Sequence, residues 1–192
     1  IQLIPCIAGF DIDDSKELPR AQEYGKFLCQ MFTLWKQDWE RGKPISIREF
    51  DNFVSMVLYQ QEPELCSMHG VCSVNPVVEA DGSVYPCDFY VLDQWKLGNI
   101  YDTAFHDLIE NEKAKTFVQY SQQLPNGCKK CRWLCWCRGG CRRTWKLSEG
   151  KIDSTIPKWC DAQKIFIPFA LTNMSSLSAA VERYYRTTPN TV

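Results

Sequence analysis

Five cysteines fall between Cys128 and Cys141, and this density of thiols constrains the fold more than any other feature of the chain. The segment reads CKKCRWLCWCRGGC, and four of its cysteines have the spacing C-x2-C-x5-C-x3-C. Thiolates are the preferred ligands of zinc and of iron–sulfur clusters, whereas a hydrophobic core has no need of so many neighbouring thiols. The glycine pair before Cys141 lets the backbone turn sharply between ligands. The segment therefore predicts a soft-metal centre.

The total number of cysteines leaves three alternatives open. The chain has 192 residues and 11 cysteines, and an odd number argues against a fully paired disulfide framework. Secreted disulfide scaffolds are also usually shorter than this chain. Metal or cluster ligation is favoured by the spacing, with disulfides and free structural thiols as the alternatives.

Charge and hydropathy narrow the class of partner. The formal net charge is −1, so no overall field favours nucleic acid or a membrane surface. No apolar run approaches the roughly 18 residues that span a bilayer, and no signal peptide is visible. We therefore expect a cytoplasmic monomer that binds neither nucleic acid nor membrane. The chain opens on IQLIPC without Met, which favours a piece of a longer protein.

Two amphipathic helices are predicted in the first third of the chain. One begins at Pro19 and ends near Gly42, and its apolar residues recur at steps of three and four. Its expected inner face comprises Tyr24, Phe27, Leu28, Met31, Leu34, Trp35 and Trp39. The second begins at Ser46, which forms a capping box with Glu49, and ends before Pro63. Its expected inner face comprises Phe50, Phe53, Val54, Val57 and Leu58.

The middle of the chain changes in character after Gln61. The run SVNPVVEADGSVYPC predicts a β-hairpin with a two-residue turn at Asp81 and Gly82. Cys87 follows the second strand directly, and Asp88 comes next. Residues 98–120 predict a third helix, capped by Asp102 or Thr103. Its expected inner face comprises Ala104, Phe105, Leu108, Ile109 and Phe117. Residues 161–186 predict a final helical segment.

The order of the cysteines closely resembles a known signature. It runs Cys72-x9-Gly82-x4-Cys87, then Cys128-x2-Cys131-x5-Cys137-x3-Cys141, then Cys160. This resembles the SPASM domain, the auxiliary-cluster module of many radical S-adenosylmethionine enzymes. Cys66 and the run DGSVYPCDFY make residues 64–165 similar, more narrowly, to the anaerobic sulfatase-maturating enzymes. Residues 1–60 resemble the last strand, last helix and linker helix of that family's partial barrel.

The resemblance implies an α+β fold in three parts. Residues 1–61 are expected to contain the end of a partial (β/α)6 barrel, with one strand and helix, and a linker helix. Residues 62–165 are expected to form the SPASM domain, with a β-hairpin, helices and cysteine-rich loops. Residues 166–192 are expected to form a helical tail.

The resemblance also implies two [4Fe–4S] clusters with interleaved ligands. The first would be held by Cys66, Cys72, Cys87 and Cys141. The second would be held by Cys128, Cys131, Cys137 and Cys160. Cys6, Cys29 and Cys135 fall outside the pattern. If the two sets interleave in this way, metal binding and folding should be one event.

Asp88 is the one catalytic residue that the resemblance implies, as the base that deprotonates the substrate. The structural alternative is a carboxylate that hydrogen-bonds the turn after the strand. The two histidines, His69 and His106, are not expected to be ligands, because the cysteine sets are complete without them.

Positive and aromatic side chains surround the expected ligands. A basic patch is expected to compensate the negative charge of the cluster, with nucleic-acid binding as the weaker alternative. It comprises Lys129, Lys130, Arg132, Arg138, Arg142 and Arg143. Trp133, Trp136 and Trp145 are expected to shield the clusters from water, with base stacking as the weaker alternative.

The sequence lacks the C-x3-C-x2-C motif of radical S-adenosylmethionine chemistry, so we expect this chain alone to be inactive. The resemblance implies a full-length protein with S-adenosylmethionine and a third [4Fe–4S] cluster. That protein would oxidise a Cys or Ser in the active-site segment of a sulfatase to Cα-formylglycine. Two alternatives are a different peptide-modifying SPASM enzyme and a non-enzymatic domain held by four-cysteine zinc sites or disulfides. An isolated fragment could also exchange iron for zinc.

Overall fold

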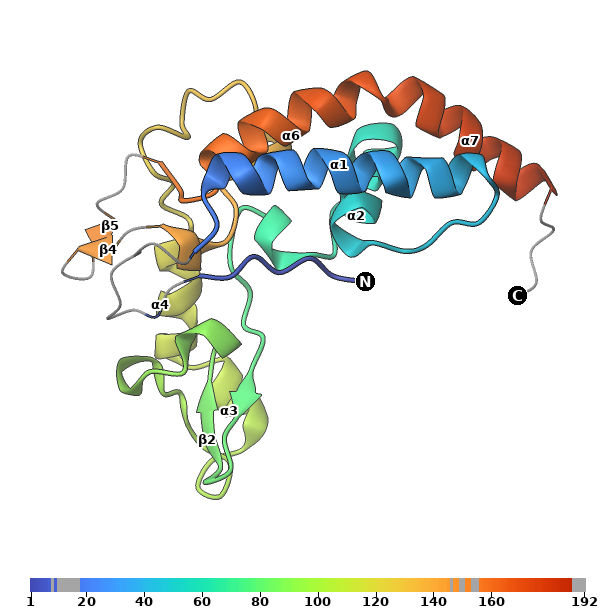
Figure 1. The fold of residues 1–192 in the computed structure, drawn as a ribbon. Helices are drawn as coiled ribbons and strands as arrows, with labels where there is room; N and C mark the ends of the chain where they lie inside the picture. Colours follow the sequence, from blue (N-terminus) through green and yellow to red (C-terminus); the bar gives the residue numbers. More distant parts are fainter. Residues whose placement is uncertain (8, 10–17, 146, 149–150, 153–155, 188–192) are drawn as a thin grey trace.

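Long helices form one layer of the molecule, and a small lobe with short strands extends from it (Figure 1). The structure is a computed structural model that describes residues 1–7, 9, 18–145, 147–148, 151–152 and 156–187. Helices α6 (Cys160–Thr172) and α7 (Met174–Thr187) run along α1 (Ala21–Glu40), and α2 (Arg48–Tyr59) contacts α7.

The small lobe contains a three-stranded antiparallel sheet and two short helices. The strands lie in the order β1 (Val77–Val78), β2 (Ser83–Tyr85), β3 (Gly98–Asn99), and the helices are α3 (Phe105–Ile109) and α4 (Glu112–Ser121). The α+β class is therefore confirmed. The division into residues 1–61, 62–165 and 166–192 stays a prediction.

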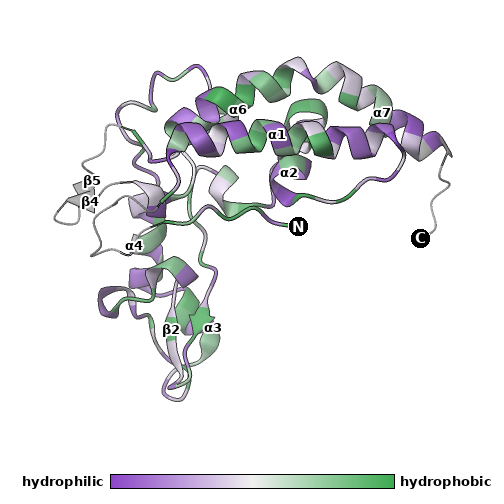
Figure 2. Ribbon diagram, viewed as in Figure 1, coloured by the Kyte–Doolittle hydropathy of each residue, from purple (hydrophilic) through white to green (hydrophobic). Residues whose placement is uncertain are grey.

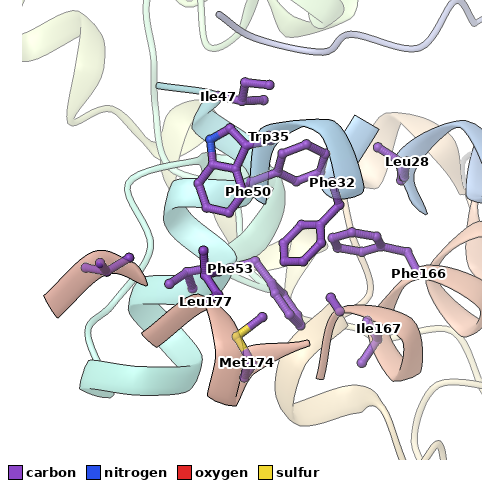
Figure 3. Packing of buried hydrophobic residues seen from close by; sticks show 13 residues of the cluster. Leu28, Phe32, Trp35, Ile47, Phe50, Phe53, Phe166, Ile167, Met174 and Leu177 are labelled. Carbon is purple, nitrogen blue, oxygen red and sulfur yellow. The ribbon is translucent and has the colours of Figure 1, made fainter. Parts of the chain in front are cut away.

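Aromatic side chains form the main core between the long helices (Figure 3). Phe32 is fully buried and contacts the ring of Phe50 edge-on at 5.2 Å between centroids. The core also takes in Phe53, Phe166, Met174 and Leu177, from α2, α6 and α7. Hydrophobic and hydrophilic residues alternate along α1, as an amphipathic helix requires (Figure 2).

The inner face predicted for α1 is correct in part. Leu28 and Trp35 are buried, but Phe27 and Leu34 are 42% and 55% exposed. The missed residue is Phe32, which lies one turn from both Leu28 and Trp35. Gly25 lies on the same face. A Cβ there would approach the Cα of Ala162 to 2.9 Å, so this glycine lets α1 and α6 pack closely.

The predicted capping box at the start of α2 is wrong. The residue before the helix is Ile47, and no side chain caps the end. Ser46 instead donates a hydrogen bond from Oγ to Asp51 at 2.6 Å, and Glu49 accepts one from the backbone N–H of Leu3 at 2.9 Å. The Glu49 carboxylate that the capping box required therefore accepts a hydrogen bond from the N-terminal segment instead. The β-prone residues 1–5 form no strand, since they pair with none in the described part of the chain.

The predicted hairpin is confirmed, although its loop is one residue longer than expected. Val77 pairs with Tyr85 and Val78 with Val84. The N–H of Glu79 bonds to the carbonyl of Ser83, which leaves three residues in the loop. Gly82 has φ +81°, a conformation that a three-residue loop requires at this position.

The helix predicted over residues 98–120 is divided. Residues 98–99 form β3, and the helical part breaks between α3 and α4 at Asn111. Neither Asp102 nor Thr103 is the cap, because Ala104 precedes α3. Leu108 and Phe117 are buried as predicted, whereas Phe105 is 47% exposed.

The C-terminal segment is helical, as predicted, but consists of two helices. They meet at Asn173 and differ in direction by 59°. Of the described residues, no single helix is long and apolar enough to cross a membrane, and α6 with α7 meets that test only as a bent pair. A small hairpin of β4 (Leu147–Ser148) and β5 (Lys151–Ile152) was not predicted. The sequence also contains three closely spaced aspartates, Asp11, Asp13 and Asp14, which lie outside the described residues.

Candidate metal centre

Four cysteines from three separate regions make up what we call the first set. Cys66 begins the short helix η1 (Cys66–Met68), and Cys72 follows a turn at Gly70, whose φ is +81°. Cys87 comes directly after β2, and Cys141 follows two glycines with positive φ. These four are Cys66, Cys72, Cys87 and Cys141, which are the ligands that the family resemblance implies for the first cluster.

The second set lies on the central cysteine-rich loop and at the start of α6. The backbone N–H of Cys131 bonds to the carbonyl of Cys128 at 3.0 Å, so a tight turn separates these two thiols. Cys137 ends the short helix α5 (Leu134–Cys137), and Cys160 begins α6. The four are Cys128, Cys131, Cys137 and Cys160.

Electrostatic interactions between the thiols follow the division into two sets. In the first set, burial and then electrostatic repulsion from Cys72 and Cys66 raise the pKa of Cys141. Burial and repulsion from Cys141 raise the pKa of Cys87 in the same way. In the second set, the pKa of Cys137 is raised by burial and by repulsion from three thiols, those of Cys128, Cys160 and Cys131. For the six thiols of the two sets whose pKa is raised, the electrostatic interactions with other thiols therefore fall within one set, which is the grouping that the resemblance implies.

Burial favours the protonated form of three of these thiols most strongly. It raises the pKa of Cys87 to about 12, and the pKa of Cys137 and of Cys141 to about 11 each. A buried thiolate is costly unless a cation accompanies it. A metal that binds here must therefore displace the protons and supply the positive charge.

One cavity of about 400 Å³ joins the two sets, because all eight thiols line it. Trp133, Trp136 and Trp145 also line this cavity, which fits the predicted shielding role. Cys6, Cys29 and Cys135 do not line it, and they fall outside the sequence pattern too.

The donors of the two sets are all thiols, which iron–sulfur clusters and zinc both accept as ligands. All 11 cysteines are free thiols. Within the described ranges, no three His, Cys, Asp or Glu side chains converge closely enough to hold one metal ion. A zinc ion needs its sulfurs within about 2.3 Å of one centre. A four-iron cluster spreads them further apart, since each thiolate bonds a different iron.

Asp88 lies on the wall of the cavity beside the first set. Its Oδ1 accepts hydrogen bonds from the Sγ of Cys87 at 3.2 Å and from the N–H of Phe89 at 3.0 Å. The second bond is the turn-stabilising contact of the structural alternative. The side chain is nevertheless exposed, so the carboxylate is accessible from the cavity.

The predicted basic patch divides into exposed and buried residues. Lys129, Lys130 and Arg132 are exposed, and Arg138 pairs with Glu62. Arg142 is only 5% exposed. Its contacts are therefore made inside the protein, among aromatic rings.

The sequence did not single out Ser121, which positions a ligand of the first set. Its Oγ accepts a hydrogen bond from the N–H of Cys72 at 2.7 Å and donates one to the carbonyl of Val118. The two residues are 49 positions apart, so no local pattern could have predicted the contact. His69 and His106 are both exposed and neither lines the cavity.

Comparison with known proteins agrees with this arrangement. Residues 66–132 match the SPASM model, described as an iron–sulfur cluster-binding domain. The chain is 40% identical over 159 residues to the cysteine-type anaerobic sulfatase-maturating enzyme of Clostridium perfringens strain 13, covering 83% of this chain and 42% of the relative. It is 35% identical over 122 residues to the serine-type enzyme of Bacteroides thetaiotaomicron, covering 62% of this chain and 28% of that enzyme.

The fold is similar to that of a solved relative. A structure of native anSMEcpe with bound AdoMet and the Kp18Cys peptide superposes with a TM-score of 0.84 at 36% identity, covering 93% of this chain and 49% of that one. A second structure, with the Cp18Cys peptide, gives a TM-score of 0.81. The chain thus spans about half the length of the relatives it matches.

Proposed function

Since the chain carries a SPASM iron–sulfur cluster-binding domain and resembles the anaerobic sulfatase-maturating enzymes, we propose that it is the auxiliary-cluster region of such a maturase. It would hold two [4Fe–4S] clusters, one on each set of four cysteines. The observation that carries this proposal is that eight thiols line one cavity and that the electrostatic interactions between them fall within two sets. Zinc domains do not require this interleaving.

The maturase would oxidise a Cys or Ser side chain in a sulfatase to Cα-formylglycine. That oxidation removes a hydrogen atom from the substrate Cβ, a proton from its thiol or hydroxyl, and one electron. From Ser this gives the aldehyde directly. From Cys it gives a thioaldehyde, which water would convert to the aldehyde with release of hydrogen sulfide. S-adenosylmethionine and its own cluster would supply the radical that takes the hydrogen atom, from sequence beyond this chain. Two SPASM-type clusters, when bound, would supply a path for the electron.

The residues of this chain would position the peptide and take the proton. Asp88 is the proposed acceptor, because its exposed carboxylate faces the cavity next to the first set. Oδ1 accepts the hydrogen bond from the N–H of Phe89, which restrains the orientation of the carboxylate. Tyr24, Trp133 and Trp159 add apolar walls that would exclude water around a bound peptide.

The experiment that tests the function uses the full-length protein with S-adenosylmethionine and a reductant, in the absence of oxygen. Peptides with the sulfatase active-site sequence are supplied in Cys and Ser forms, and products are identified by mass. We expect formylglycine from at least one form. If neither peptide reacts while another peptide is modified, the chain belongs to a SPASM enzyme of different specificity.

A further inference from the structure

Arg142 is a buried positive charge directly after a cysteine of the first set. It is 5% exposed, and its Nη1 donates one hydrogen bond to the carbonyl of Phe117 at 2.9 Å. Its Nε is buried without a hydrogen-bond partner. In the described part of the chain no carboxylate pairs with it, although buried charges are normally paired.

Four aromatic rings surround the guanidinium, and we call them the aromatic cage. The distances from Cζ of Arg142 to the ring centroids lie between 5.3 and 5.4 Å for Tyr90, Trp95, Phe117 and Tyr120. The rings pack edge to face, with Phe117 at 5.2 Å from both Tyr90 and Trp95. Cation–π contacts hold the guanidinium in position, but an uncharged ring does not neutralise it.

Two of the elements that form the aromatic cage adjoin cysteines of the first set. Tyr90 lies in η2 (Asp88–Tyr90), the short helix directly after Cys87. Phe117 and Tyr120 lie in α4, whose Ser121 hydrogen-bonds the backbone of Cys72. Arg142 lines the same cavity as the four cysteines of this set, and Cys141 precedes it directly in the chain.

The second set has a different kind of positive neighbour. Lys164, on the same helix as Cys160, also lines the cavity, but its side chain is exposed. Water and salt screen an exposed charge, whereas a buried charge acts at close to full strength. The two sets thus lie in unequal electrostatic environments.

We propose that Arg142 is the fixed counter-charge of the first cluster and raises its reduction potential. The inference rests on the proposed function, since it requires a cluster on the first set. Reduction adds one electron to a cluster that is already negative. A nearby positive charge stabilises the reduced form more than the oxidised form, so the potential rises. Arg142 acts on the cluster without being a ligand, and the cage holds it in place.

The test compares Arg142→Met with Arg142→Lys in protein produced without oxygen. Redox titration is followed by electron paramagnetic resonance, and the first cluster is identified by the signal that Cys72→Ala removes and Cys131→Ala keeps. Removing the charge should lower the ratio of reduced to oxidised first cluster about tenfold at a given potential, which corresponds to 59 mV for one electron. Arg142→Lys should stay near the unaltered protein.

A matched control is available in Arg132. It also follows a cysteine directly and lies 4.5 Å from the ring centroid of Trp133, but it is exposed. Arg132→Met should leave the potential of the first cluster unchanged.

The outcomes separate the inference from the function it rests on. Absence of iron and sulfide from the unaltered protein would remove the proposed function itself. Normal cluster content with no shift in Arg142→Met would overturn the role of Arg142 alone. If Arg142→Met loses the first cluster while Arg142→Lys keeps it, the positive charge is still the required property. Loss in both variants would show that the arginine is only a packing residue.

Discussion

Asp88 combines two features that are seldom found on one carboxylate. It stabilises the turn after β2 through the N–H of Phe89, and it remains exposed on the wall of a cavity lined by thiols. The turn contact needs only an acceptor oxygen, whereas proton transfer needs a carboxylate. The two roles can therefore be separated by substitution.

Asp88→Asn keeps the acceptor for Phe89 but cannot take a proton from the substrate. We expect formylglycine formation by the full-length protein to fall by roughly 100-fold or more, which is the usual contribution of a general base. Iron and sulfide content should not change. The measurement is the rate of product formation by mass spectrometry.

Asp93 provides the control for this substitution. It is also the exposed first residue of a short helix, η3 (Asp93–Trp95), but does not line the cavity. Asp93→Asn should keep the normal rate. A near-normal rate in Asp88→Asn as well would remove Asp88 from the mechanism and leave it as a turn residue.

The sequence identifies single residues only where spacing along the chain carries the information. The family resemblance implies two sets of four cysteines, which stay a prediction; the electrostatic interactions between thiols in the structure fall within these sets. The aromatic cage could not be found in this way. Its rings come from three elements, and Tyr90 and Phe117 meet only after η2 and α4 have packed.

At the scale of elements, tertiary contacts override local signals at two helix starts. Glu49 was expected to cap α2 but binds the N-terminal segment instead. Asn111 interrupts the helix predicted over 98–120, because its Oδ1 accepts from the N–H of Ala114 and its Nδ2 donates to the carbonyl of Leu97. The first change depends on a residue 46 positions away, so it could not be predicted locally. The second change depends on Asn111, and because Asn favours helix N-caps, a helix start at this residue could be predicted from the sequence.

The contact between α1 and α6 determines where Cys160 lies, and it depends on Gly25. A Cβ at this position would lie 2.9 Å from the Cα and 3.0 Å from the carbonyl oxygen of Ala162. Backbone atoms cannot move aside as a flexible side chain can. Gly25→Ala gains up to about 1 kcal/mol of helix propensity, but overpacking typically costs about 1–3 kcal/mol. We therefore expect net destabilisation, measured as a lower midpoint of thermal unfolding.

Lys26 is the control, because it is exposed on the same helix. Lys26→Ala should change the midpoint little. An unchanged or higher midpoint in Gly25→Ala would mean that the close approach of the two helices is not a requirement of the fold.

At the scale of the whole molecule, the two lobes differ in how much apolar surface they bury. The helical layer has a core of 13 buried residues from α1, α2, α6, α7 and the segment before α2, whereas the core of the small lobe comprises Val84, Leu97, Leu108 and Ala114. A core this small supplies little stability without further cross-links. In the proposed arrangement the clusters are those cross-links.

Removing metal should therefore affect the lobes unequally. After anaerobic treatment with a chelator, we expect amide hydrogens in β2 and α4 to exchange faster by a large factor, while those in the middle of α1 remain protected. Hydrogen exchange followed by mass spectrometry measures this directly. Equal protection before and after metal removal would show that the small lobe folds on its own.

The account depends above all on two clusters being held by eight thiols, and metal analysis tests this most directly. The chain is purified without oxygen, and iron, acid-labile sulfide and zinc are measured together with the visible spectrum. We predict about eight irons and about eight sulfides per chain, with broad absorption near 400 nm. Zinc without sulfide, even after anaerobic reconstitution, would contradict the account and favour a structural zinc domain.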